Sequence, residues 1–538
     1  MNTNFKHIEI FAGCGGMSLG LKAAGFDLHM ANDLSPMAGE TFAYNLFGEN
    51  LELLATKKLK SEKVLWIKSQ YAADNLKERL RENPNEYSKG KYSDLNSKVD
   101  LSGKLIIGNI DHLLHFITTN QRILNHLREQ NVDLLSGGPP CQGFSLAGKR
   151  VKDDHKNILP LSFAKFAGLI QPKIVLLENV KGITSPFQTD DKVKHFAWLE
   201  TAKAFSLEGF YPICMLVNSK YFGVPQNRPR FILLAFRKDV YTRFSRKANH
   251  SHKIKQILSN SSHFFHLVNT SSDNLDSITN SDINLYNIEK SYELFNGYLL
   301  PKIINNNKNY LKVSEAIGDI SSIDNPYFLD SINNYYANKL TKTFKREFFL
   351  SSNQLQNHVN RRHNFNVKAR FRLYQIFSNS NELKKDLTVI LSGTNDRQDL
   401  LERVYSIVKD KEILFSIDNG TEVLKRPDDF LFFKKYIQQI CSRKNSQRAL
   451  KADEPAPAQM TIPDDFCHFL PSQLRTLTVR EMARIQSFPD WFVFRSKITT
   501  GGNQRNFEIP QYTQVGNAVP PLLAYELGVT ISGILNTI

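Results

Sequence analysis

Ile8-Glu9-Ile10-Phe11-Ala12-Gly13-Cys14-Gly15-Gly16, near the start of the chain, is the stretch that decides the fold. An apolar run of the kind found in strands leads into a glycine-rich turn, and a helix-compatible segment follows. Glycine accepts positive φ and carries no Cβ, so the backbone of this turn can approach a ligand at the N-terminus of the next helix. The spacing is not Gly-x-Gly-x-x-Gly, so the turn alone does not distinguish a ligand site from a tight connection.

The alternation of apolar runs with helix-compatible segments continues over roughly the first 240 residues. It predicts a doubly wound α/β domain with a parallel sheet. The predicted strands are residues 8–11, 28–31, 105–107, 132–135, 174–177 and 231–236.

Unusual residues follow these runs, namely Gly13, Asp33, Asn109, Cys141 and Glu178. Open sheets bind ligands beyond the carboxyl ends of their strands, so we expect one crevice to collect these side chains. Asp33 ends the second strand, where an acid commonly binds a ribose hydroxyl pair. An adenosine-containing cofactor is therefore favoured, with a solvated turn aspartate as the alternative.

Cys141 follows two prolines in the stretch Gly137-Gly138-Pro139-Pro140-Cys141-Gln142-Gly143-Phe144-Ser145. Proline fixes φ and lacks an amide donor, so Pro139 and Pro140 stiffen the chain that presents the thiol. Cys141 is a candidate nucleophile. The alternative is a buried structural cysteine in a proline turn.

Glu178 and two arginines complete the candidate chemistry. Glu178 directly follows an apolar strand, where desolvation raises a carboxyl pKa and makes it a candidate acid. Arg228 and Arg230 are alternate residues of an extended segment, so both could face one way and favour a thiolate or clamp a phosphate. The alternative for each is an ordinary surface arginine.

The composition indicates which partners and which cellular compartment to expect. The 538 residues include 69 Lys and Arg against 53 Asp and Glu, a formal net charge of +16. This excess favours a polyanionic partner, although binding to a membrane surface or a ribosome would give the same balance. The five cysteines are scattered without the spacing of a metal site or a disulfide framework, as expected in a reducing cytoplasm. We expect no metal, no export signal and no membrane span.

Two regions interrupt the α/β pattern. Residues 51–104 are polar and lysine-rich, and we expect a surface insertion there. Residues 245–309 are rich in Ser, Asn and Asp, which indicates loops or a loosely packed domain boundary.

The order of the motifs is more specific than any one of them. Together they resemble, block by block, the cytosine-5 DNA methyltransferases over roughly the first 240 and the last 65 residues. The motifs are Phe11 to Gly16, Pro139-Pro140-Cys141-Gln142, Glu178-Asn179-Val180, Gln226 to Arg230, Arg475 to Pro489, and Gln514 to Pro521.

The resemblance implies transfer of a methyl group from S-adenosyl-L-methionine to C5 of a flipped-out cytosine in double-stranded DNA. Cys141 would add to C6 of the base, and Glu178 would contact its N3 and exocyclic amine. Arg228 and Arg230 would order the loop and the sugar-phosphate of the target.

The resemblance also implies a cofactor site. Asn109 stands where the family usually carries aspartate near the adenine; its amide oxygen could still accept from the adenine amine, and Asp111 is an alternative partner. The expected cofactor-binding residues are Phe11, Ala12, Gly13, Gly15, Gly16, Asp33, Leu34, Asn109, Ile110, Pro140, Leu159, Asn517, Ala518 and Val519.

For the domains, the resemblance implies a Rossmann-like catalytic domain over 1–245 and a smaller target-recognition domain over 246–507. Residues 508–538 would return to the catalytic domain, and the segment from Arg475 to Glu481 would hold the recognition loops against it. The expected DNA-binding residues are Gln142, Ser145, Arg361, Arg362, Lys368, Arg370 and Arg372.

A bacterial, cytoplasmic and monomeric modification enzyme that protects DNA from a matching restriction endonuclease fits this resemblance, although a solitary methylase would have the same sequence features. The RNA-methylating branch of the family is disfavoured by Cys141-Gln142-Gly143 and the long middle region. A catalytically silent DNA-binding relative is disfavoured by the intact Cys141, Glu178 and arginine pair. A nicotinamide-dependent oxidoreductase would need a phosphate-cradling turn that the sequence lacks.

Overall fold

The computed structural model describes most of the chain. The residues outside the description are 1–3, 141–158, 189–193, 248–249, 272, 306–308, 322–328, 351–352, 394–396, 418–419, 443, 445, 460 and 462–463.

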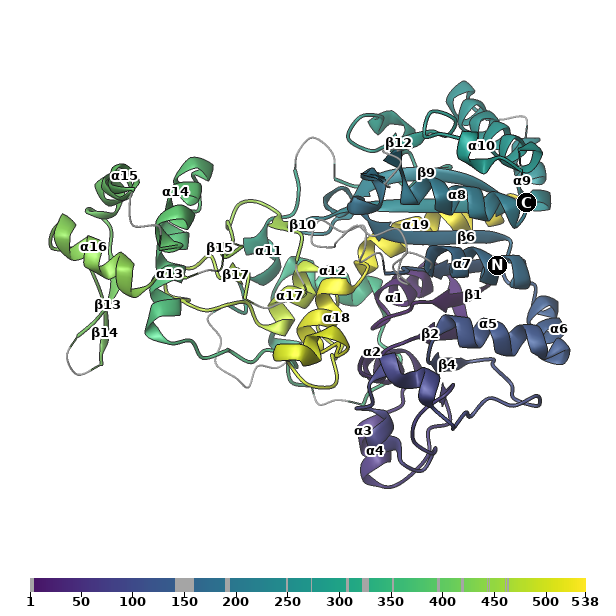
Figure 1. Cartoon of the computed structure of the whole chain (residues 1–538), viewed down its shortest axis with the longest axis horizontal. Coiled ribbons are helices and arrows are strands. Elements are labelled where there is room, and N and C mark those ends of the chain that lie inside the picture. Colours follow the sequence, from purple (N-terminus) through teal and green to yellow (C-terminus); the bar gives the residue numbers. More distant parts are fainter. Residues whose placement is uncertain are drawn as a thin grey trace.

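A nine-stranded sheet forms the larger lobe (Figure 1). Every neighbouring pair is parallel except those of β11, which runs antiparallel to β6 and β9. In spatial order the strands are β12 (Leu285–Asn287), β9 (Phe210–Asn218), β11 (Pro229–Arg237), β6 (Ile174–Val180), β5 (Leu134–Gly137), β1 (Phe5–Ile10), β2 (Phe26–Asp33), β4 (Lys104–Ile107) and β3 (Val64–Trp66).

All six predicted strands are present, and the doubly wound α/β class is confirmed. The expectation that residues 231–236 run parallel to the others is wrong, because β11 is antiparallel. An apolar run fixes the burial of a strand but not its direction.

The pairing register of the parallel strands brings their carboxyl ends to one edge of the sheet. Ile10 pairs with Asn32 on one side and with Gly137 on the other. Gly137 in turn pairs with Leu177, so β6 continues past β5 to Glu178. The carboxyl ends of β1, β2, β5 and β6 therefore meet, as an open parallel sheet requires for a shared site.

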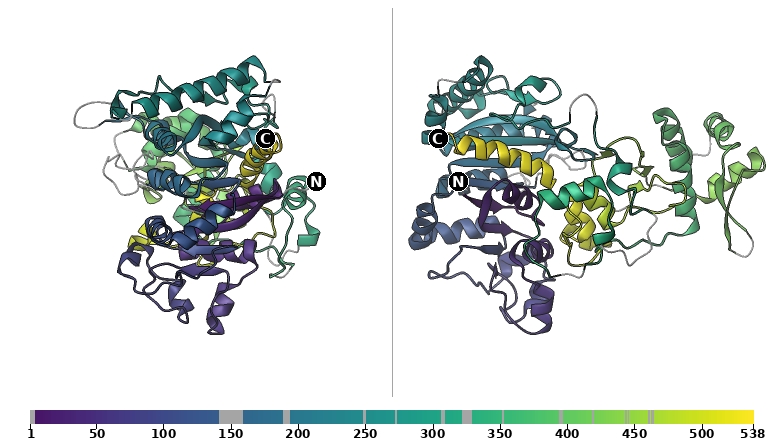
Figure 2. Two further views of the ribbon diagram at one scale, coloured as in Figure 1. Left: turned by 90° about the vertical axis from the view of Figure 1, so that its right-hand side faces the viewer. Right: turned by 180° about the vertical axis from the view of Figure 1, so that it is seen from behind.

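Helices cover both faces of the sheet, and alternate residues of each strand face opposite layers (Figure 2). In β6, Val175 and Leu177 face one layer, while Ile174 and Leu176 face the other. The first layer contains α5 (Ile110–Thr119), α6 (Gln121–Glu129), α7 (Leu159–Ile170) and α8 (Ala197–Leu207). The second contains α1 (Gly16–Ala23), α9 (Lys238–Ser245) and α19 (Pro521–Leu535), and α10 (His252–Thr270) contributes to both.

Helices α1 and α19, which come from the two ends of the chain, pack against each other. A Cβ on Gly20 would lie 2.3 Å from the carbonyl oxygen of Pro521, so glycine is required for this close approach. Figure 2 shows the yellow C-terminal helix lying across one face of the sheet. The last helix is thus part of the larger lobe.

Three strands of the large sheet, β3, β9 and β12, lie outside the runs that predict strands. β3 belongs to the region predicted to be a surface insertion, yet it pairs with β4 and buries Trp66. β12 and α10 follow residue 245, but β12 pairs with β9 and α10 packs on the same strand. The region assigned to target recognition therefore begins with elements that belong to the sheet.

A smaller lobe lies apart from the sheet and has its own apolar core (Figure 1). It is built from α13 (Phe365–Ile376), α14 (Asn381–Leu391), α15 (Gln398–Val408), α16 (Phe430–Gln439) and a hairpin of β13 (Ile413–Ser416) and β14 (Glu422–Lys425). Short pairs lead to and from it, namely β10 (Gln226–Asn227) with β16 (Ala456–Pro457), and β15 (Arg448–Ala449) with β17 (Phe466–Cys467).

Between the lobes lies a helical joint of α11 (Val313–Ile317), α12 (Tyr335–Thr343), α17 (Val479–Ile485) and α18 (Gln511–Asn517), whose core also includes residues of α2 (Pro36–Phe42) and α4 (Leu76–Arg79). Within the described residues, the remaining α-helix is α3 (Leu51–Thr56) and the remaining strands are β7 (Phe187–Gln188) and β8 (Lys194–His195).

The joint is rich in buried charge. Arg475 donates two bonds of 2.7 Å to Glu481, which also caps α17 together with Thr478. Arg484 donates to Asp490 and, at 2.6 Å, to Asp319 beyond α11. Paired and multiply hydrogen-bonded charges of this kind fix one arrangement of the segments they join.

Within the described residues, no single helix has the length and apolar character of a membrane span. Residues 502–517 and α19 reach that threshold only as a pair bent by 66°, and most of α19 is buried in the core.

We predict that His468 makes the joint acid-sensitive. Its Nδ1 accepts from the Leu470 amide at 3.0 Å while Nε2 contacts the Ser321 hydroxyl at 2.8 Å, and burial lowers its pKa to about 4. The unfolded chain binds the proton below about pH 6.5, so the free energy of unfolding falls as pH drops from there towards 4. Urea unfolding should show a shallower decline for His468→Asn than for the wild type. The exposed His252→Asn should keep the wild-type slope, and equal slopes for all three proteins would contradict the prediction.

Candidate active site at the carboxyl ends of the strands

The glycine turn after β1 is open on one side only. Phe11, Gly13 and Gly15 have φ of 56°, 55° and 93°. A Cβ on Gly13 would meet no atom within 4 Å, whereas one on Gly15 would lie 2.6 Å from Leu46 and one on Gly16 2.5 Å from the Val519 carbonyl oxygen. The turn therefore packs against the protein through Gly15 and Gly16 and leaves Gly13 facing free space.

Asp33 holds this turn in place. Its Oδ2 accepts from the Gly13 amide at 2.7 Å, and its Oδ1 accepts from the Ser35 amide at 2.8 Å. Burial raises the pKa of Asp33, and the two backbone donors oppose that rise. Each carboxylate oxygen keeps a further lone pair for a hydroxyl ligand. The neighbouring Leu34 is 40% exposed and offers an apolar surface beside it.

Asn109 caps α5, and its Oδ1 accepts from the Asp111 amide at 2.8 Å. The amide oxygen expected to accept from an adenine therefore already accepts one backbone hydrogen bond and keeps its second lone pair. Asp111 accepts from the Ser162 hydroxyl at 2.7 Å.

Glu178 and Arg230 form a buried ion pair. Arg230 Nε lies 2.6 Å from Glu178 Oε1, and the two residues come from the neighbouring strands β6 and β11. Burial raises the pKa of the Glu178 carboxyl, and the guanidinium groups of Arg230 and Arg228 oppose this rise. The arrangement provides a carboxyl group that can hold or share a proton nearer neutrality than an exposed glutamate does.

The loop after β5 is attached to this pair. Asn179 donates from Nδ2 to the Pro139 carbonyl oxygen at 3.0 Å. A Cβ on Gly138 would lie 3.1 Å from Glu178 Oε2. The chain therefore passes directly beside the Glu178 carboxyl just before Cys141. Cys141, Gln142 and Ser145 lie outside the described residues.

Arg228 has other partners than Arg230, although the charges of both act on Glu178. The Arg228 guanidinium donates to the carbonyl oxygens of Gly516 at 2.6 Å and Ala518 at 3.2 Å. It also donates to Gln226 Oε1 and to the Gln459 carbonyl oxygen, both at 3.3 Å. The residue is 2% exposed, so the expectation of a pair that clamps a phosphate is not met by Arg228.

The other expected cofactor residues gather at the same edge. Pro140 follows β5, Ile110 begins α5 and Leu159 begins α7. Ala518 and Val519 pack on Gly16. Asn517 ends α18 and is exposed.

Most of the expected DNA-binding residues make contacts within the protein. Arg361 pairs with Asp464 at 2.7 Å, and Lys368 pairs with Glu422 at 2.8 Å. Arg370 and Arg372 donate to the carbonyl oxygens of Ile440 and Glu412, and Arg370 is buried. Arg362 is exposed.

Glu9 is a buried acid at this edge that the sequence analysis leaves out. It accepts a hydrogen bond from the Ser18 hydroxyl, and burial raises its pKa to about 8. A carboxylate between two isoleucines in a predicted strand is the signal that could have identified it.

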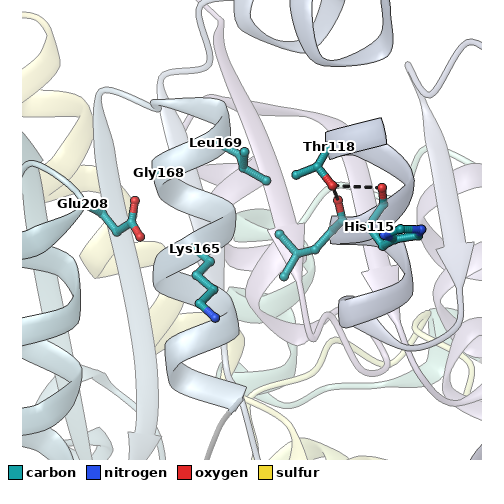
Figure 3. A pocket seen from close by; sticks show the side chains of 7 residues that line it. His115, Thr118, Lys165, Gly168, Leu169 and Glu208 are labelled. Atoms are coloured by element: carbon teal, nitrogen blue, oxygen red, sulfur yellow. Dashed lines mark hydrogen bonds between the residues drawn. The ribbon is translucent and has the colours of Figure 1, made fainter. Parts of the chain in front are cut away.

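A shallow hollow elsewhere on the lobe is unrelated to this edge. It lies between α5 and α7 and is lined by His115, Thr118, Lys165, Leu169 and Glu208 among others (Figure 3). The side chains belong to the helical layer and not to the strand ends.

The fold is shared with a known methyltransferase structure. A protein described as a prophage-encoded DNA modification methyltransferase of E. coli aligns over 99% of both chains with a TM-score of 0.52 and 17% identity. The fold class is therefore the Rossmann-like methyltransferase sheet.

The family follows from the sequence match. Residues 5–65 and 109–533 match the model of the C-5 cytosine-specific DNA methylase family, so the protein belongs to that family and is a DNA (cytosine-5) methyltransferase. The unmatched interval lies almost wholly within the region predicted as an insertion. Two similar proteins are the type II methyltransferases M.DdeI of Desulfomicrobium norvegicum, 25% identical over 98% of this chain and 88% of its own, and M.XorII of Xanthomonas oryzae pv. oryzae, 24% identical over 97% and 83%.

We predict that Gly16→Ala is more damaging than Gly13→Ala. The added methyl of Gly16→Ala meets the Val519 carbonyl oxygen and must separate the turn from the C-terminal segment. Gly13→Ala meets no atom, and its positive φ costs about 1 kcal/mol. Thermal unfolding should show the larger loss for Gly16→Ala, and the reverse order would contradict the packing described here.

Proposed function

We propose that the protein transfers the methyl group of S-adenosyl-L-methionine to C5 of a flipped-out cytosine in a specific double-stranded DNA site. The observation that carries the proposal is the buried Glu178–Arg230 pair beside the Pro139-Pro140 turn, at the sheet edge that also holds the open glycine turn.

Cys141 is the proposed nucleophile on the evidence of its sequence position. Its thiolate would form a bond to C6 of cytosine and push the electron pair of the C5–C6 double bond towards C5. Glu178 would hold a proton at N3 and accept from the exocyclic amine, which makes the ring electron-poor at C6. Loss of the proton from C5 after methylation would restore the double bond and release the thiolate.

The edge of the sheet fits the cofactor. S-adenosyl-L-methionine supplies an electrophilic methyl group when bound. Gly13 leaves room for backbone approach, Asp33 offers carboxylate lone pairs to the ribose hydroxyls, and Leu34 offers an apolar face to the adenine. Phe11 places an aromatic ring where a sulfonium would be attracted to it.

DNA would bind between the lobes. Extrusion of the base costs a few kcal/mol, which contacts to the distorted duplex must offset. We propose that target recognition uses the smaller lobe and the loops around it, within the expected range 246–507. Of the basic residues expected to contact DNA, Arg362 is the exposed one, whereas the paired or buried positions of the others suit a scaffold.

The two relatives carry the names of type II methyltransferases. We propose the same setting here, in which a monomeric enzyme modifies sites that a partner restriction endonuclease would cut.

We predict that Cys141→Ala abolishes methyl transfer while DNA binding persists. A duplex with 5-fluorocytosine at the target should become covalently attached to the wild type, because fluorine at C5 cannot leave as a proton does. Denaturing gel electrophoresis of the labelled duplex measures the adduct. Full transfer by the alanine variant would refute the nucleophile.

We also predict that Asn109→Asp tightens cofactor binding. Aspartate retains the cap on α5, and its second oxygen can accept from the adenine 6-amine, a gain of roughly 1 kcal/mol or about fivefold in Kd. Isothermal titration with S-adenosyl-L-homocysteine measures the change. The 6-oxo analogue S-inosyl-L-homocysteine lacks the amine and should not gain, so an equal gain for both ligands or none for either would contradict the prediction.

A further inference from the structure

Arg228 occupies an unusual place for a motif arginine. It lies between β10 and β11, and the four described hydrogen bonds of its guanidinium end on three different segments of the chain. Burial and the nearby charge of Arg230 lower the pKa of Arg228, and Glu178 partly opposes this. A buried cation is retained in a structure when its hydrogen bonds compensate the lost hydration.

The carbonyl groups that Arg228 holds flank Asn517. The next residue after them, Val519, supplies the carbonyl oxygen that lies against Gly16. The guanidinium thus sets how far the segment Gly516–Val519 stands from the glycine turn. The same segment would otherwise present two unsatisfied carbonyl groups in a buried place.

A second set of hydrogen bonds connects Arg228 to the joint. Gln226 Oε1 accepts from Arg228 and from the Gln459 amide, both at 3.3 Å, and Gln459 Nε2 donates to the Met482 carbonyl oxygen at 3.1 Å. Gln226 also lies in β10, which pairs with β16 on the chain returning from the smaller lobe. Arg228 therefore connects that return segment to the wall of the glycine turn.

We propose that Arg228 is a positioning residue for the cofactor site, which fixes the wall Gly516–Val519 over the glycine turn, and that it makes no contact with DNA. This inference rests on the proposed function, since it takes the glycine turn to be the S-adenosyl-L-methionine site. Arg230, two residues on, keeps its place beside the base-binding carboxyl.

The test compares cofactor affinity with the salt dependence of DNA affinity. For Arg228→Lys and Arg228→Gln, isothermal titration should show the Kd for S-adenosyl-L-homocysteine raised about tenfold, the worth of one charge-assisted hydrogen bond. The Lys variant should lose less, because it can still donate to one or both carbonyl groups. Binding to a non-specific duplex should keep the wild-type slope of log K against log salt.

Arg480→Lys is the matched control. Arg480 is equally buried and also donates to three carbonyl groups, those of Gln356, Pro489 and Phe492, but in the joint. Arg480→Lys should lower thermal stability without a selective loss of cofactor affinity. The comparison therefore distinguishes a positioning role of Arg228 from general destabilisation of the protein.

An unchanged Kd for S-adenosyl-L-homocysteine in both Arg228 variants, with a salt slope reduced by about one, would overturn the inference and return Arg228 to a phosphate contact. Equal loss of cofactor affinity in Arg480→Lys would overturn it as well. A wild-type protein that binds neither S-adenosyl-L-methionine nor its product would instead overturn the proposed function, so the two failures are distinct.

Discussion

The ion pair between Glu178 and Arg230 is the constraint on which the rest of the site depends. Two charges removed from water are costly unless geometry and further contacts compensate, and here the atoms lie 2.6 Å apart on adjacent strands. The antiparallel direction of β11 brings Arg230 to the carboxyl end of β6. The fold thus maintains a carboxyl group of raised pKa at the carboxyl ends of the strands.

Distant parts of the chain complete this edge. The N-terminal glycine turn, the proline turn after β5 and the C-terminal segment around Val519 meet there. Gly16, Gly20 and Arg228 are among the residues that contact the C-terminal segment and help to hold it in place. The buried ion pairs Arg475–Glu481, Arg484–Asp319 and Arg484–Asp490 lie within the joint between the two lobes and hold its segments in one arrangement.

Sequence patterns predicted six strands of the large sheet, because buried strands are continuous apolar runs. The glycine turn became informative only through the order of the other motifs. β9 went unpredicted although all nine of its residues are buried. β3 went unpredicted because it has only three residues and lies in a polar, lysine-rich region. Alternation suggested that Arg228 and Arg230 face one way, and the charges of both act on Glu178, but no sequence pattern indicates that the two guanidinium groups have different partners. Arg370 is buried in helix α13, and its guanidinium donates to the Ile440 carbonyl oxygen. No sequence pattern distinguishes such an arginine from one that binds DNA.

The most direct test of the account is the chemical identity of the methylated base. DNA incubated with the purified protein and methyl-labelled S-adenosyl-L-methionine would be digested to nucleosides and separated by chromatography. The account predicts that all of the label is found in 5-methyldeoxycytidine. Label on the amino nitrogen of cytosine or on adenine would contradict it, because neither reaction needs a base activated at C6 beside a proton-holding carboxyl.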